Sequence, residues 1–416
     1  MMIDFKYGAD ASLRLELPVG VLVADCSGPA ATEINVARAT RSACDAPLDF
    51  PALKQAIVPG DRVVLALGPG VSQAPEVVAA IVVLLCDAGV ASSDITVLRT
   101  LSDADAGAAD PRSHLSAEHK DVQLAIHNPY DQEQLGYLAT DTHGEPIYLN
   151  RQLCDADLVI PIGCLRTDPA PAVNGNRQIG LWNDTLYPAF ADAKTVRHFA
   201  PSAIALSGGQ AAQRRKEVDQ LAWLLGIQAT IQVVPGERDS ALGVFAGSPE
   251  AVFHAGRELC QSAWQPEVSQ RATLVIAGIG GGPAQQTWEN LDRALEAALD
   301  LVEDGGAVVL CTQLKAEPGP ALRHLAQPSD DEAIRKRLRK DRSADAPLAR
   351  LLAESLDRVT IYLLSGLDED LVTSLGVGYV AEPKEIGRLA SHCDPCILVA
   401  NAQFARPTVA AERSRR

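Results

Sequence analysis

The chain has 416 residues, of which 47% are hydrophobic and 22% charged, a composition typical of a globular protein with room for two or three domains. Its formal net charge of −16 argues against a surface that binds nucleic acid or an anionic membrane, because such surfaces need clustered lysine and arginine. No apolar run reaches the roughly 20 residues of a membrane-spanning helix, and the first residues lack the pattern of a signal peptide. We therefore expect a cytoplasmic protein.

The first clear structural unit is a strand, a helix and a second strand, predicted at Arg62–Leu67, Ala74–Ala88 and Ile95–Leu98. This order is typical of a parallel sheet. The turn Gly68-Pro-Gly-Val-Ser-Gln73 places backbone N–H groups before a helix, where they could hold an anion, although Pro69 removes one donor. Residues 1–57 before this unit are predicted to be an irregular entry with short strands.

The acidic segment 101–150 is predicted to be rich in loops. Its histidines at positions 114, 119, 127 and 143 have no metal-like spacing, and we expect each at the surface.

The stretch Asp155–His198 is the strongest candidate for a functional segment. An apolar run, Leu158–Ile162, predicts a buried parallel strand, and a long segment rich in Gly, Pro, Asn, Asp, Arg and Trp follows it. Ligands commonly bind beyond the carboxyl ends of such strands, and a loop of this length in a compact domain is usually functional or flexible.

Alternating strands and helices continue to the end of the chain, which predicts an α/β fold: two α/β domains with parallel or mixed sheets and a cleft between them. The linker-like Trp264-Gln-Pro-Glu267 suggests the boundary. We predict an amino-terminal domain at 1–265, a carboxyl-terminal domain at 266–404 and a disordered tail at 405–416.

Two motifs are set aside on sequence grounds. In Gly278-Ile-Gly-Gly-Gly-Pro283 a proline stands where a dinucleotide fingerprint needs its third glycine, and no acidic residue closes the next strand. This argues against a nicotinamide dehydrogenase. The nine cysteines suit reduced core thiols, and the single pair Cys393 and Cys396, just before an apolar strand, is better explained by structure than by metal binding.

In the order of its elements the chain resembles the nickel-dependent lactate racemase family. The resemblance is carried by the strand–helix–strand unit from Gly60 to Leu98, by Ala156–Ile160 leading to Gly175-Asn-Arg177, and by Val244–Gly247 before the helix with His254. Gly281-Gly-Pro283 through Trp288 to Gly305-Gly306 extends it nearly to the carboxyl end. It implies two α/β domains with a cleft that binds a small molecule.

The resemblance also implies a nickel pincer nucleotide joined to a lysine, a histidine on the nickel, two acid/base histidines, and an arginine and a lysine that bind the substrate. In this chain the attachment lysine falls on Gln178, directly after Gly175-Asn-Arg177, and Gln cannot form that link. The acid/base positions fall on Asp168 and near Asp103, and the substrate lysine falls near Asp292. The substrate arginine is replaced within Gly68–Gln73, and His198 is the position available as a nickel ligand.

Two functions remain open. The first is a racemase or epimerase with an altered site that acts on a 2-hydroxy acid or a related substrate. Its acid/base groups would be Asp168, Asp103 and His198, and His198 is also the candidate metal ligand. The nucleotide would be held by Gly175, Arg177 and Gln178. The substrate would contact Trp288 and Asp292. The second is a non-catalytic binding protein that has kept the scaffold.

For single residues simpler interpretations compete. Asp168 precedes a proline and suits a turn, Arg177 suits an ion pair, and His198 suits a helix end or the core. The sequence predicts no oligomeric state.

Overall fold

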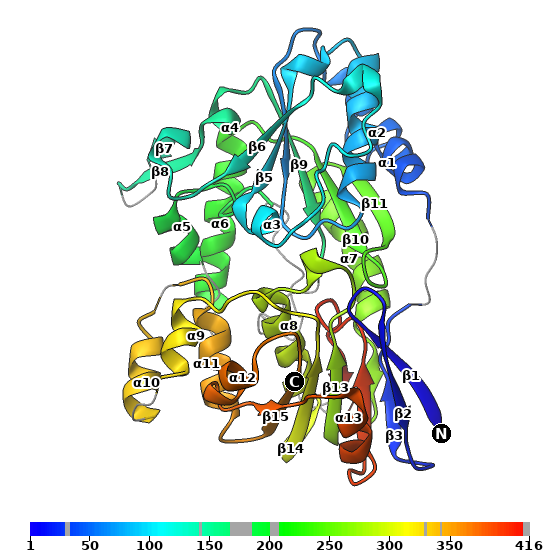
Figure 1. Ribbon diagram of the computed structural model, residues 1–416. Helices are drawn as coiled ribbons and strands as arrows, with labels where there is room; N and C mark the ends of the chain where they lie inside the picture. Colours follow the sequence, from blue (N-terminus) through cyan, green and yellow to red (C-terminus); the bar gives the residue numbers. More distant parts are fainter. Residues whose placement is uncertain are drawn as a thin grey trace.

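The computed structural model describes residues 1–29, 34–140, 144–166, 185–199, 208–327, 331–341 and 343–410. These residues form two α/β domains, one above the other in Figure 1. The α/β class expected from the sequence is confirmed.

The strands are β1 (Met2–Tyr7), β2 (Ala11–Glu16), β3 (Leu22–Asp25), β4 (Val63–Leu67), β5 (Ile95–Thr100), β6 (Gln123–His127), β7 (Leu135–Thr140), β8 (Pro146–Asn150), β9 (Leu158–Cys164), β10 (Thr230–Pro235), β11 (Ala241–Gly247), β12 (Glu267–Val268), β13 (Ala272–Gly278), β14 (Val302–Cys311), β15 (Thr360–Leu364), β16 (Gly378–Tyr379), β17 (Cys396–Val399) and β18 (Thr408–Val409). The helices are α1 (Val36–Asp45), α2 (Ala74–Asp87), α3 (Leu101–Asp105), α4 (Arg151–Asp155), α5 (Ala193–Phe199), α6 (Gly208–Leu224), α7 (Pro249–Trp264), α8 (Trp288–Leu299), α9 (Pro320–Leu325), α10 (Asp331–Leu338), α11 (Ala346–Ser355), α12 (Glu369–Ser374) and α13 (Pro383–Ala390).

The upper, amino-terminal domain is built on a six-stranded sheet in the order β11-β10-β9-β4-β5-β6, parallel except for β11. Every residue of the central strand β4 is buried, as expected for a strand covered on both faces. Leu65 packs toward α1 and α2, whereas Val64 and Ala66 pack toward Leu153 of α4 and Phe190.

The lower, carboxyl-terminal domain has a parallel six-stranded sheet in the order β16-β15-β14-β13-β17-β3. Alternate residues of β13 point to opposite faces. Val275 and Ala277 join the core formed with α8 and α11, and Leu274 and Ile276 join the core under α13 and the β1–β2 hairpin.

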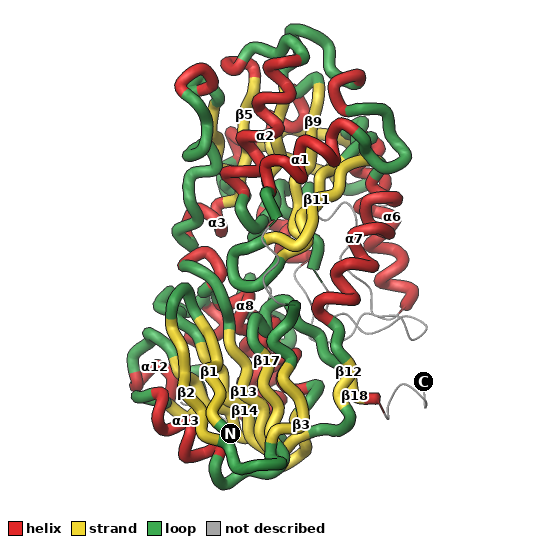
Figure 2. Tube along the Cα trace, turned by 90° about the vertical axis from the view of Figure 1, so that its right-hand side faces the viewer, coloured by secondary structure: helices red, strands yellow, loops and turns green. Residues whose placement is uncertain are grey.

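The first three strands lie in the carboxyl-terminal domain, not in the amino-terminal one to which the prediction 1–265 assigned them. β3 pairs with β17, and the β1–β2 hairpin lies beside β13 (Figure 2). Phe5, Leu13 and Leu15 of the hairpin join one core with Leu274 and Ile276 of β13. The alternation of exposed and buried residues in β1 and β2 explains why the hairpin needs a second layer to cover its apolar face.

Three further expectations are wrong. Segment 101–150, predicted to be rich in loops, contains α3, β6 and the β7–β8 hairpin, and His127, expected at the surface, is only 1% exposed. Residues 405–410 of the predicted disordered tail are ordered, because β18 pairs with β12 and the Arg406 side chain is only 1% exposed. A strand predicted at 203–206 lies outside the described residues.

The chain crosses between the domains after β3 and after α7, and both crossings meet the turn between β10 and β11. The Trp264 indole N–H donates to the Pro235 carbonyl at 2.8 Å. The Asn401 Oδ1 accepts from the Arg238 N–H at 2.9 Å, and its Nδ2 donates to the Ser27 carbonyl at 3.5 Å. This side of the molecule therefore joins the domains.

No helix among the described residues is long and apolar enough to cross a membrane. All nine cysteines are free thiols, as predicted, and five of them are buried: Cys26, Cys44, Cys260, Cys311 and Cys396.

Candidate functional site

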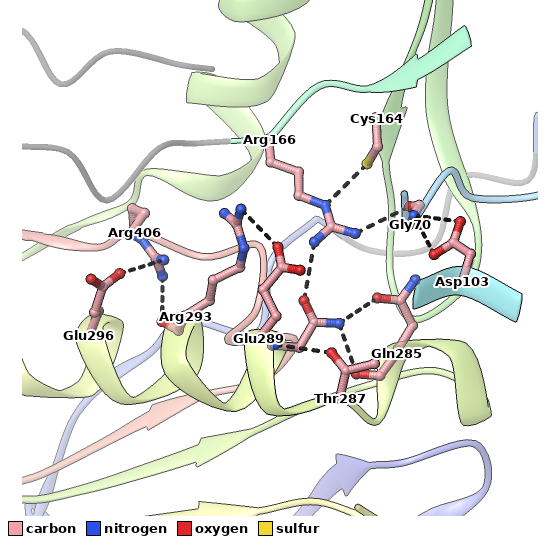
Figure 3. A network of polar contacts seen from close by, with 11 residues as sticks. Gly70, Asp103, Cys164, Arg166, Gln285, Thr287, Glu289, Arg293, Glu296 and Arg406 are labelled. Atoms are coloured by element: carbon pink, nitrogen blue, oxygen red, sulfur yellow. Dashed lines mark hydrogen bonds and ion pairs between the residues drawn. The ribbon is translucent and has the colours of Figure 1, made fainter. Parts of the chain in front are cut away.

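Residues that follow the strands of both sheets meet between the two domains (Figure 3). In the amino-terminal domain Gly70 follows β4, Asp103 lies in α3 after β5, and Arg166 follows β9. In the carboxyl-terminal domain the glycine-rich loop after β13 leads into α8. The carboxyl ends of parallel strands commonly form ligand sites.

Arg166 is the centre of this interface. Its Nη1 donates to Asn290 Oδ1 at 3.1 Å, its Nη2 to the Gly70 carbonyl at 3.2 Å, and its Nε to Cys164 Sγ at 3.3 Å. Its Cζ lies 5.3 Å from the centre of the Phe404 ring, a cation–π contact. One guanidinium thus contacts both domains.

The Asn290 side chain is fixed by its own neighbours. Its Nδ2 donates to the Gln285 carbonyl at 2.8 Å and to Gln285 Oε1 at 3.1 Å, which leaves Oδ1 to accept from Arg166. Its backbone N–H donates to Oγ1 of Thr287, the N-cap of α8, at 3.1 Å. The start of α8 therefore orients the acceptor for Arg166.

Gly70 is required by geometry on two counts. Its φ of +68° lies in the left-handed region, and a Cβ there would come 1.9 Å from Arg166 Nη2. Its N–H lies 3.3 Å from both carboxylate oxygens of Asp103.

Asp103 is a half-buried carboxyl group in the first turn of α3, which Thr100 caps. Burial raises the pKa of Asp103 to about 6, and the charge of Glu289 adds to that increase. The Gly70 N–H and the cations Arg166 and Arg99 work in the opposite direction without cancelling it. Asp103 can therefore exchange a proton near neutral pH.

Two acids on α8 respond differently to their surroundings. Desolvation by neighbouring groups works to raise the pKa of Glu289, whose side chain is still 65% exposed, but the guanidinium groups of Arg293 and Arg166 lower it below its usual value. Burial and the nearby Glu296 raise the pKa of Asp292 to about 7. Glu289 is therefore ionised at neutral pH, and Asp292 is close to half protonated.

Of the residues predicted from sequence, the structure brings Asp103 to Gly70, the residue whose carbonyl accepts from Arg166. Asp292 and Trp288 lie on α8, but the Trp288 indole N–H donates to the carbonyls of Ala316 and Glu317 at 2.9 and 3.1 Å. That N–H is therefore bonded to the loop after β14.

Four predicted residues lie outside the described residues: Asp168, Gly175, Arg177 and Gln178. His198 belongs to α5, and its side chain also lies outside what the structure describes.

Sequence reasoning missed Arg166, Gly70 and Asn290 as members of one site. Arg166 carried a usable signal, since it is a cation two residues beyond a buried strand in the stretch singled out as functional. Gly70 and Asn290 have no comparable signal, because only the tertiary fold brings them to Arg166.

The glycine-rich loop after β13 is not a phosphate cradle. The N–H of Gly280 donates to Gln403 Oε1, that of Gly281 to the Gly8 carbonyl and that of Gly282 to Asp239 Oδ2. Because protein acceptors take all three N–H groups, the loop joins the domains instead of binding a nucleotide.

The part of the chain that the structure describes contains no group of three or more His, Cys, Asp and Glu residues placed to hold a metal ion. The residues that would hold a nickel pincer nucleotide by resemblance are those outside it, with glutamine at the attachment position.

Comparison with known proteins agrees with this architecture. Residues 7–175 match the family model described as lactate racemase N-terminal domain. The structure is similar to the lactate racemase apoprotein from Thermoanaerobacterium thermosaccharolyticum, with a TM-score of 0.75 and 15% identity over 98% of this chain and 100% of that one. It is also similar to a protein from Thermotoga maritima, with a TM-score of 0.65 and 13% identity over 90% of this chain and 97% of the other. No curated protein sequence matches the chain.

The family match covers most of the amino-terminal domain, and the structural likeness covers nearly the whole chain. The predicted resemblance is thereby confirmed: residues 7–175 match the lactate racemase N-terminal domain model, and the chain has the same fold as the lactate racemase apoprotein.

Proposed function

We propose that the protein is an isomerase, a racemase or epimerase that acts on a small 2-hydroxy acid or related carboxylate bound between its two domains. The observation that supports this most is Asp103, a carboxyl group with a pKa of about 6, located where strands of both sheets end. A general base works best when its pKa lies near the working pH.

In this proposal the Asp103 carboxylate removes the proton from the α-carbon of the substrate. The C–H bond breaks, an O–H bond forms on Asp103, and the electron pair is delocalised toward the substrate carboxylate. The Asp103 O–H then exchanges its proton with solvent, and transfer of a solvent-derived proton back to the same carbon, with return of the electron pair to the C–H bond, completes exchange. Inversion needs an acid on the opposite face, and Asp168 and His198 remain the predicted candidates for that role.

The nickel pincer nucleotide remains a prediction of the family resemblance, with Gly175, Arg177, Gln178 and His198 as the residues that would contact it. The amide of Gln178 does not fit covalent attachment, and no step here passes through the nucleotide.

A non-catalytic binding protein is the second candidate. It is favoured by the way Arg166 uses three donors on protein acceptors from both domains, an arrangement that also suits a purely structural contact. This function predicts ligand binding without chemistry.

The deciding experiment is α-proton exchange in D₂O, followed by NMR, with a panel of 2-hydroxy acids and sugar acids. We expect the wild-type protein to replace the α-proton with deuterium and Asp103→Asn to lose at least about 100-fold of the rate, the usual contribution of a general base. Asp105→Asn is the matched control, because Asp105 is exposed on the same helix. Absence of exchange with every substrate, in protein made with and without the maturation enzymes of the nickel cofactor, would leave the non-catalytic function.

A further inference from the structure

Arg166 makes no direct ion pair with any of the described residues. By contrast, Arg293 contacts Glu289 at 3.4 Å and Arg406 contacts Glu296 at 3.3 Å. The partners of Arg166 in the described part of the chain are neutral: an amide, a carbonyl, a thiol sulfur and an aromatic ring.

The two carboxylates that influence Arg166 are engaged elsewhere. Asp103 accepts from the Gly70 N–H, and Glu289 contacts Arg293. The positive charge of Arg166 is thus left without a contacting counterion among the described residues. A half-buried cation in that position favours an added anion, because the lower local dielectric strengthens the attraction.

The guanidinium also has donors to spare. It carries five N–H groups, and its three hydrogen bonds use one on each nitrogen. Among the described residues, one N–H on each of Nη1 and Nη2 has no acceptor and could bind a ligand. A carboxylate has two oxygens and can accept from both.

The position of the group is set before any ligand binds. Asn290, itself oriented by Gln285, and the Gly70 carbonyl hold the two Nη atoms, and the Phe404 ring packs on the guanidinium. A donor held in place in this way loses little conformational entropy on binding.

We infer that Arg166 is the residue that binds the carboxylate of the ligand, with Asn290 as the residue that positions it. The inference rests on the proposed function for the class of ligand, a small 2-hydroxy carboxylate. It also gives this chain a cation for the carboxylate at a site different from the arginine and lysine positions that its sequence has lost.

Calorimetric titration of the full-length protein with glycolate, lactate and tartrate tests the inference, with glycolamide and lactamide as neutral analogues. We expect at least one carboxylate to bind, its amide to bind at least tenfold more weakly, and affinity to fall as salt is raised. Arg166→Met should weaken carboxylate binding at least tenfold, Arg166→Lys by less, and Asn290→Ala severalfold. Arg62→Met is the control, because Arg62 pairs with Asp157 within one domain, at 3.0 Å.

Circular dichroism and thermal melting establish whether each variant is folded. If Arg166→Met does not fold, Arg166→Lys, which keeps the positive charge, still tests the inference. Carboxylate binding that is unchanged in Arg166→Met and Arg166→Lys overturns the inference, as does a wild-type protein that binds none of the three acids. Asp103→Asn separates the two proposals: it should abolish exchange while carboxylate binding persists. Binding at Arg166 without exchange in the wild type would overturn the proposed function and leave this inference standing.

Discussion

Asp103 and His127 are both shielded from water, and burial shifts their pKa values in opposite directions. Burial disfavours the charged form, which raises the pKa of an acid and lowers that of a base. Asp103 lies beside the proposed site. His127 is the last residue of β6 and is only 1% exposed, and its Nε2 is bonded to the Ala191 carbonyl at 2.9 Å. One shift bears on activity and the other on stability.

For Asp103 we predict a pH dependence of exchange. The carboxylate must be ionised to take a proton, and its pKa is about 6, so the exchange rate should fall about tenfold for each pH unit below that value. Deuterium incorporation measured between pH 5 and 8 checks this. A rate that stays constant down to pH 5 would exclude Asp103 as the base.

For His127 we predict acid destabilisation. Burial lowers the pKa of His127 below the usual histidine value of about 6.5, so the unfolded chain takes up a proton at a higher pH than the folded one does. The stability that this histidine contributes is therefore complete above pH 6.5 and is lost as the pH falls. His127→Gln should lower the melting temperature at pH 8, at a cost of roughly 1 to 3 kcal/mol, and by less at pH 5.5. An equal loss at both pH values would contradict the prediction.

At the scale of elements, the loop between β4 and α2 has less space for a side chain at its glycine than the loop before β4 has. Gly70 and Gly60 both have positive φ, +68° and +96°, but a Cβ at Gly60 meets nothing within 4 Å, whereas one at Gly70 meets Arg166. An alanine at position 60 would therefore introduce backbone strain alone, whereas an alanine at position 70 would introduce strain and also displace Arg166.

We therefore predict that Gly60→Ala costs roughly 1 to 2 kcal/mol and leaves carboxylate binding unchanged. Gly70→Ala should cost more and weaken carboxylate binding at least tenfold, because Arg166 must move. Thermal melting and calorimetric titration of the two variants provide the comparison. Wild-type affinity in Gly70→Ala would show that the position of Arg166 does not control binding.

The elements that the sequence predicted well are those buried on both faces or strongly periodic. The apolar runs of β4, β9 and β13 and the helices α2 and α7 were located within a few residues, because local hydrophobicity specifies them. The strand β6 was missed because it lies at an edge of its sheet, with a single fully buried residue, His127. The start of α8 follows from its Thr287 cap, whereas the contact of Arg166 with Gly70 and Asn290 depends on three distant segments and has no local pattern.

At the scale of the whole molecule, the segment before the carboxyl terminus joins the domains. Arg406 donates to the Arg293 carbonyl at 2.7 Å and contacts Glu296, and its backbone N–H donates to the Trp264 carbonyl at 2.7 Å. Its position explains why residues 405–410 are ordered, because a buried arginine needs a paired charge and the Arg406 guanidinium contacts Glu296.

We predict that removing residues 411–416 leaves the melting temperature unchanged within about 1 °C, since the contacts of Arg406 and β18 stay intact. Removing residues 405–416 should destabilise the protein by roughly 3 kcal/mol or more, because it deletes the buried Arg406 and the strand β18. Arg406→Met should give much of that loss without shortening the chain. Equal stability of the two truncated proteins would contradict this account.

The pairing of β3 with β17 has a consequence for how the molecule is made. The first strands leave the ribosome early, yet their partners β13 and β17 belong to the last part of the chain to be synthesised. Until then the apolar face of the β1–β2 hairpin has no sheet to cover it, while the amino-terminal sheet between residues 63 and 247 can already assemble from its own strands. Folding of the lower domain must therefore wait until β17 has been synthesised. A gene fragment that starts at the interdomain linker would encode a sheet without its edge strand β3 and without the β1–β2 hairpin that covers one face.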